Sequence, residues 1–192
     1  MTDAFQFVKP HLLKPHVEIE FRLGKKNGNL FDTNIGKSNY DKLLRRLSRY
    51  PAWDQVKKQN AVVYYGLRRG LRIVYDEDTD DQTVVYKHKL DALDIPLEGL
   101  PVDVRIGVAL ETPATYDTEK DKFPTEKKRQ RISFIRKGLS IDLSIIQNMD
   151  RDSEEEFVYQ LELEILKPET CDERKFTNHF HKVFDVLKLI EC

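Results

Sequence analysis

Two stretches near the ends of the chain are the most informative about its architecture: His16-Val17-Glu18-Ile19-Glu20-Phe21-Arg22-Leu23-Gly24 and Tyr159-Gln160-Leu161-Glu162-Leu163-Glu164-Ile165-Leu166. Each alternates between apolar and polar residues, which is the pattern of a β-strand with one face in a core. Either stretch alone also fits a sheet with one solvated face. If the two strands pair, however, they lie about 5 Å apart and gather four carboxylates on one patch. Like charges directly opposite each other are destabilising, so the patch predicts a divalent cation, Mg²⁺ or Mn²⁺.

The composition limits the class of protein. The 192 residues fit a single domain over 1–192 that can bury a real core. Charged residues make up 34% of the chain, yet the formal net charge is −1, so electrostatic recognition must be local. The two cysteines, Cys171 and Cys192, predict no disulfide framework and fit a reducing, intracellular compartment. No apolar run approaches the ~20 residues of a membrane span, and no signal-peptide pattern is present.

The rest of the chain predicts two helices and further strands. Residues 1–15 are expected to be a lead-in segment, interrupted by Pro10 and Pro15. Ser38, followed by Asp41, is predicted to cap a helix over 38–50. An amphipathic pattern predicts a C-terminal packing helix over 172–190. Further strands are expected at 61–67, 70–76, 83–89, 102–111, 129–135 and 139–145.

The polar faces of these strands carry charges of both signs. They include Glu18, Glu20, Arg22, Arg72, Lys87, Lys89, Arg105, Glu111, Arg129, Arg131, Asp142, Glu162 and Glu164. Such faces on strand after strand suit the lumen of a barrel, and eight strands leave room inside for side chains or one small ligand. We therefore expect an α+β, mainly β fold: a closed eight-stranded antiparallel β-barrel with a hydrophilic lumen, covered outside by helices.

Acidic and basic residues in one lumen predict a ligand that is polyanionic and binds metal, namely a triphosphate. Arg contacts phosphate oxygens bidentately, and Lys acts as a point charge. Phosphoryl transfer needs mainly positioning and charge neutralisation, with the metal polarising a phosphate oxygen. Glu111 is the candidate for orienting a water molecule for in-line attack. Trp53, Tyr64 and Tyr65 are interpreted as packing residues rather than as a platform for base stacking.

Three motifs add a resemblance: Glu18-Ile-Glu20-Phe-Arg22-Leu-Gly24, Arg129-Gln-Arg131-Ile-Ser-Phe-Ile with Glu126 before it, and Glu162-Leu-Glu164-Ile. In this order, the region from about residue 16 to residue 166 resembles the triphosphate tunnel metalloenzymes. The likeness is to their metal-dependent RNA 5′-triphosphatases of fungi, protozoa and large DNA viruses. Within that group, the motifs are similar to those of the triphosphatase domain of a giant-virus mRNA capping enzyme.

The resemblance implies roles for individual residues. It implies a Mg²⁺ or Mn²⁺ site formed by Glu18, Glu20, Glu162 and Glu164. It implies catalytic roles for Glu111, Arg72, Lys87, Arg129 and Arg131. The phosphate-binding or supporting residues are Lys127 and Asp142, from the resemblance, and Arg22, Lys89 and Arg105, from the strand faces. Two positions depart from the family: Gln160 stands where some members have a third Glu, and Ser140 where some have Arg.

The implied reaction removes the γ-phosphate of 5′-triphosphate RNA and leaves a 5′-diphosphate end. This is the first step of mRNA capping, and side activity on nucleoside triphosphates is expected. The expected partners are the 5′-triphosphate end of nascent RNA, nucleoside triphosphates and, in a longer native chain, guanylyltransferase and methyltransferase domains. No membrane is expected among them. If the protein is viral, we expect it in the host cytoplasm or the virion.

Two alternatives stay open. One is a sibling tunnel enzyme of the CYTH type that acts on tripolyphosphate, thiamine triphosphate or ATP. That group usually has E-x-E-x-K, whereas Arg22 replaces the Lys here. The other is a non-catalytic module that binds triphosphate RNA ends. Both share the lumen chemistry, so they differ from the favoured hypothesis in what is hydrolysed, if anything.

Overall fold

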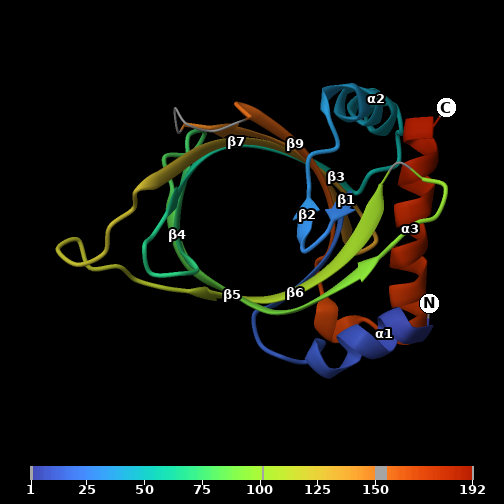
Figure 1. Ribbon diagram of the computed structural model, residues 1–192, viewed down its shortest axis with the longest axis horizontal. Coiled ribbons are helices and arrows are strands. Elements are labelled where there is room, and N and C mark those ends of the chain that lie inside the picture. Colours follow the sequence, from blue (N-terminus) through green and yellow to red (C-terminus); the bar gives the residue numbers. More distant parts are fainter. Residues whose placement is uncertain (1, 101, 150–154, 192) are drawn as a thin grey trace.

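The computed structural model describes residues 2–100, 102–149 and 155–191. Its strands form one antiparallel sheet in the order β2-β1-β6-β5-β4-β3-β7-β8-β9, and a further pairing of β1 with β9 closes it. Eight strands therefore make a closed barrel, which Figure 1 shows end-on, while β2 pairs only with the end of β1. The predicted closed eight-stranded antiparallel barrel is confirmed.

The elements have the following bounds. The strands are β1 (Val17–Asn27), β2 (Leu30–Asp32), β3 (Gln55–Tyr65), β4 (Leu71–Asp76), β5 (Gln82–Ile95), β6 (Asp103–Pro113), β7 (Thr125–Arg136), β8 (Leu139–Asn148) and β9 (Phe157–Ile165). The helices are α1 (Thr2–Val8), α2 (Lys37–Ser48) and α3 (Glu173–Glu191), with short 3₁₀ turns at η1 (Lys9–His11) and η2 (Pro168–Thr170). Several strands are longer than predicted. In β5, a bulge between Lys89 and Asp91 breaks the alternation by which a strand is recognised in sequence.

The two stretches that open the sequence analysis are neighbours at the closing pair. Glu20 of β1 lies opposite Glu164 of β9, and Arg22 lies opposite Glu162. On its other side, β1 pairs with β6, where Gly107 is opposite Glu20. A Cβ at Gly107 would lie 3.1 Å from a carboxylate oxygen of Glu20, so the glycine leaves room for that side chain.

The hydrophobic core lies outside the barrel. Phe21, on the outward face of β1, is fully buried, and its ring centre is 5.6 Å from Phe176 and 5.4 Å from Phe180 of α3. Figure 1 shows the three helices gathered on one side of the ring, with α1 and α2 at the two ends of α3. The barrel is therefore inverted as expected, with apolar side chains under the helices and polar ones in the lumen.

Two details of the helices differ from the prediction. There are three helices in the described residues rather than two, because the lead-in segment contains α1, whose Phe5 and Val8 are buried in the core. Ser38 as the N-cap of α2 is wrong. The helix begins at Lys37 after Gly36, which has φ 78°, a conformation that glycine adopts without strain. None of the helices in the described residues is long and apolar enough to cross a membrane.

Candidate active site

The lumen holds a cavity of about 580 Å³ to which all eight barrel strands contribute side chains. Nine of its lining residues were singled out from the sequence: Glu18, Arg22, Arg72, Lys87, Glu111, Arg129, Arg131, Glu162 and Glu164. Residues more than 140 positions apart in the chain therefore share one enclosed volume. The alternation of polar and apolar residues is what turns all of them inward.

One side of the cavity is an acidic wall, formed by Glu18 and Glu20 of β1 and Glu162 and Glu164 of β9. Glu20 is buried and, unlike the other three, does not line the cavity itself. Nε of Arg22 lies between two of these carboxylates, 2.8 Å from Glu20 and 3.0 Å from Glu162. Burial raises the pKa of Glu20 above its usual range even though Arg22 opposes this. The four carboxyl groups of the acidic wall therefore outnumber the one arginine that lies between them.

Glu164 is the least neutralised member of the acidic wall. Among the described residues it has no hydrogen bond and no ion pair within 4 Å of its side chain. Burial, together with the nearby Glu18 and Asp142, raises the pKa of Glu164 to about 8. At neutral pH, and with no other cation present, this carboxyl group is mostly protonated.

Lys87 of β5 connects the acidic wall to Glu111. Its Nζ is 2.6 Å from Oε2 of Glu18 and 3.7 Å from Oε2 of Glu111. Burial lowers the pKa of Lys87, but Glu20 and Glu18 outweigh burial and raise it. The Glu111 side chain is 38% exposed, more than Glu18, so it has room for a water molecule beside it. Its backbone N–H donates to the carbonyl of His16 at 2.9 Å, which ties this end of β6 to the start of β1.

Arg131 of β7 forms an ion pair with the acidic wall on its β9 side. Its guanidinium is 3.1 Å from Glu162 and 3.3 Å from Asp142, and its Nε donates to Oγ of Ser144 at 3.1 Å. Asp142 is buried behind the cavity wall and accepts a hydrogen bond from Ser140. Asp142 thus supports the arginine rather than lining the cavity.

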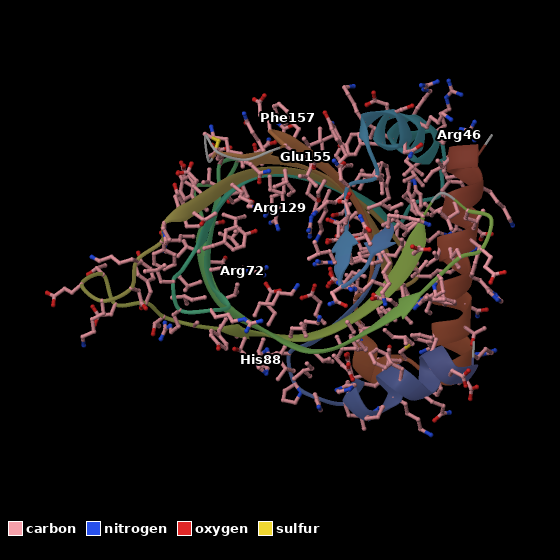
Figure 2. The ribbon with its side chains drawn as sticks, in the orientation of Figure 1. Arg46, Arg72, His88, Arg129, Glu155 and Phe157 are labelled. Carbon is pink, nitrogen blue, oxygen red and sulfur yellow. The ribbon has the colours of Figure 1, made fainter. Side chains whose placement is uncertain are left out.

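A basic wall lies across the lumen. In the ring of eight strands, β3 and β4 are four places from β1 and β9, respectively, and so face them. Figure 2 shows Arg72 of β4 and Arg129 of β7 pointing into the enclosed space from this side. Arg129 donates to Gln59 at 3.0 Å, yet Nε of each arginine is buried and has no hydrogen-bond partner in the part of the chain that the structure describes. Burial and the nearby Arg131 lower the pKa of Arg129, so this wall is short of negative charge.

The remaining predicted residues lie away from the cavity. Lys89 is exposed beside the bulge of β5. Arg105 is held by Asp94 through contacts of 2.6 and 2.9 Å. Lys127 does not line the cavity either, although its Nζ is 6.0 Å from the centre of the Tyr65 ring.

The sequence interpretation missed Tyr65. This residue lines the cavity, whereas its neighbour Tyr64 lies in a groove on the outside of the barrel. The alternation along β3, in which Val63 and Tyr65 share the inward face, was the signal that could have found it.

The acidic wall has the chemistry of a site for a hard divalent cation. All its donor atoms are carboxylate oxygens, which Mg²⁺ and Mn²⁺ prefer, and Glu164 has no partner within the described ranges. Among the described residues, no three His, Cys, Asp or Glu side chains stand together as ready metal ligands. In this structure Arg22 and Lys87 bind the oxygens of Glu20 and Glu18. The residues fit a cation that competes with these two side chains.

Comparison with known families identifies the chain. The model of the family described as mRNA capping enzyme, beta chain, the mRNA triphosphatases, matches residues 48–191. The chain belongs to this family. The match includes Glu111, both glutamates of β9 and the basic wall, whereas Glu18 and Glu20 precede it. The predicted family and the predicted enzyme class, an RNA 5′-triphosphatase of mRNA capping, are confirmed.

Solved structures are similar over almost the whole chain. The S. pombe Pct1 RNA triphosphatase has a TM-score of 0.78 and 16% identity, over 99% of this chain and 87% of that one. In complex with the Spt5 CTD, Pct1 gives a TM-score of 0.80 and 16% identity, over 98% and 90%. The Mimivirus capping enzyme triphosphatase has a TM-score of 0.68 and 14% identity, over 97% and 96%. These likenesses establish the tunnel fold. The search of curated proteins gave no match.

Proposed function

We propose that this RNA triphosphatase is metal-dependent and hydrolyses the bond between the β- and γ-phosphates of 5′-triphosphate RNA. The observation that carries the proposal is the acidic wall that faces a basic wall across one 580 Å³ cavity. A triphosphate chelated by a divalent cation has positive charge on one side and negative charge on the other. It therefore complements both walls at once.

Glu18, Glu20 and Glu164 would hold Mg²⁺ or Mn²⁺, with Glu162 completing the acidic set while it orients Arg22 and Arg131. When bound, the ion would neutralise phosphate oxygens and polarise the bond to be cleaved. The unpartnered, protonated Glu164 supports this assignment, because a buried carboxyl group that lacks a partner gains most from a cation.

The basic residues would bind the phosphate oxygens. Arg72 and Arg129 line the cavity and, among the described residues, neither forms an ion pair with a carboxylate, so both can bind phosphate without first breaking an ion pair. Arg131 and Lys87 connect this group to the acidic wall and would neutralise the charge that develops on the oxygens. Glu111 would orient the attacking water, with Oε2 accepting its proton. Arg105 is neutralised by Asp94, and we assign it and Lys89 no contact with the triphosphate.

The same chemistry extends to other ligands. Nucleoside triphosphates carry the same three phosphates, so we infer side activity on them. Because Pct1 is known in complex with the Spt5 CTD, a peptide of that type is a further candidate partner of this chain. We place the activity inside the cell, where nascent RNA ends are produced.

Phosphate release separates the hypotheses. We would measure it from γ-labelled triphosphate RNA, ATP, tripolyphosphate and thiamine triphosphate, with Mg²⁺, with Mn²⁺ and with EDTA. The proposal expects metal-dependent release from RNA that Glu20→Gln and Glu164→Gln each lower by at least about 100-fold. Glu169→Gln, at an exposed site outside the barrel, is the matched control.

Two other outcomes would support the alternatives. A higher kcat/KM for tripolyphosphate or thiamine triphosphate than for RNA would indicate a CYTH-type enzyme. Tight binding of triphosphate RNA without phosphate release under any metal condition would indicate a non-catalytic binding module.

A further inference from the structure

Tyr65 has cations on two sides. It ends β3, between β4 and β7, and lines the cavity. The guanidinium carbon of Arg72 is 5.2 Å from the centre of its ring, and Nζ of Lys127 is 6.0 Å from it. Both distances are within the range of about 6 Å in which a cation is attracted to an aromatic ring.

The Tyr65 ring can hold neighbouring cations of the basic wall without neutralising them. Arg72 of β4 and Arg129 and Lys127 of β7 lie on the two strands that flank β3, and these cations repel one another. A carboxylate would hold them, but it would also neutralise them, as Glu162 and Asp142 do with Arg131. The ring of a tyrosine attracts cations through its quadrupole while it carries no net charge. The cations beside it keep their full charge for an anionic ligand.

We propose that Tyr65 is a positioning residue that holds Arg72 in place to bind the triphosphate and keeps Lys127, which does not line the cavity, beside the basic wall. The inference rests on the proposed function of the cavity and goes beyond it by assigning a role to an uncharged side chain. Tyr65 acts through the two cations, so it affects any substrate that carries a triphosphate, whatever is attached to it.

Variants at two neighbouring positions of β3 test the proposal and provide its controls. Tyr65→Phe keeps the ring, whereas Tyr65→Leu removes the ring and keeps an apolar side chain. Tyr64→Leu makes the same change at the neighbouring position, which faces the outer groove. The measurements are kcat and KM for triphosphate RNA and for inorganic tripolyphosphate, together with thermal unfolding of each variant.

We expect Tyr65→Leu to lower kcat/KM about tenfold, mainly by raising KM, and by the same factor for both substrates. Tyr65→Phe and Tyr64→Leu should stay within about twofold of the wild type. A second readout is the binding of tripolyphosphate in EDTA, where hydrolysis does not proceed. Tyr65→Leu should weaken this binding in the wild type and have no further effect in an Arg72→Met, Lys127→Met background.

Several results would overturn the proposal. Equal KM values for Tyr65→Leu and the wild type would exclude positioning. A defect with RNA and none with tripolyphosphate would instead indicate that Tyr65 stacks on a base. A loss in Tyr65→Phe as large as that in Tyr65→Leu would assign the role to the hydroxyl group. If the wild type itself neither binds nor hydrolyses either substrate, the proposed function fails, which is a different outcome from all of these.

Discussion

Glu20 of β1 lies directly opposite Glu164 of β9, in the strand pair that closes the barrel. A ladder with like charges at this position is unfavourable, and burial raises the pKa of both carboxyl groups. The barrel nevertheless closes here, because the outward neighbours Phe21 and Leu163 are opposite each other and fully buried in the core. Apolar packing on one face of the pair thus holds together an electrostatically strained arrangement on the other.

Divalent cations should stabilise the protein through this pair. We expect Mg²⁺ or Mn²⁺ at 100 times its dissociation constant to add about 2.7 kcal/mol to the free energy of unfolding. Glu164→Gln should lose most of this gain, because the amide does not replace a charged ligand. Thermal unfolding with and without the ion tests this, and calorimetric titration gives the affinity. A full gain in the Glu164→Gln variant would remove Glu164 from the metal site.

The stability of the metal-free protein should fall as the pH rises. The pKa of Glu164 is about 8 in the folded chain against 4.5 without its environment, so between these values the folded state binds more protons. The contribution is fully present below about pH 4.5 and is lost as the pH rises through 8. Melting temperatures in EDTA from pH 5 to 9 would show the decline, and Glu164→Gln should flatten it. A wild-type profile that rises over this range would contradict the assignment.

Removing Arg131 should destabilise the barrel as well as inactivate it. Arg131→Met leaves the buried carboxylate of Asp142, only 4% of whose side chain is exposed, without its cation. The expected loss is about 3 kcal/mol of unfolding free energy, which urea denaturation would measure. Lys128→Met is the control, since Lys128 is exposed on the same strand. Equal stabilities of the two variants would show that Asp142 finds another partner.

The helical cover should depend on Phe21. Phe21→Ala deletes the ring that contacts Phe176 and Phe180, and a loss of about 3–5 kcal/mol is expected. Because α3 packs on this ring, hydrogen exchange in α3 should accelerate before that in β7 and β8. Phe157→Ala, at an exposed position at the start of β9 (Figure 2), should change stability by less than about 1 kcal/mol. Similar losses in the two variants would argue against the core that we describe.

The sequence was sufficient to predict strands and their inward residues where an alternating apolar pattern and charged residues occur together. Strict alternation at 17–23 and 159–165 predicted two strands with four inward glutamates, and the structure pairs these strands. Alternation failed where the backbone departs from it. The bulge after Lys89 shifts the register between β5 and β6, and Gly36, with its positive φ, takes the N-cap position that was expected at Ser38.

The two-residue period of a strand predicted from the sequence which face most of the charged side chains take, because the apolar residues of each strand pack in the core on the opposite face. The period was not enough for Lys89, which is exposed beside the bulge of β5, or for Tyr65, which lines the cavity. Which of the inward residues contact one another could be seen only in the folded barrel. Arg105 is occupied by Asp94, Arg131 reaches Glu162, and Tyr65 lies between Arg72 and Lys127. These partnerships depend on strand order and register around the closed ring, and both follow from the packing of the whole chain rather than from any local pattern.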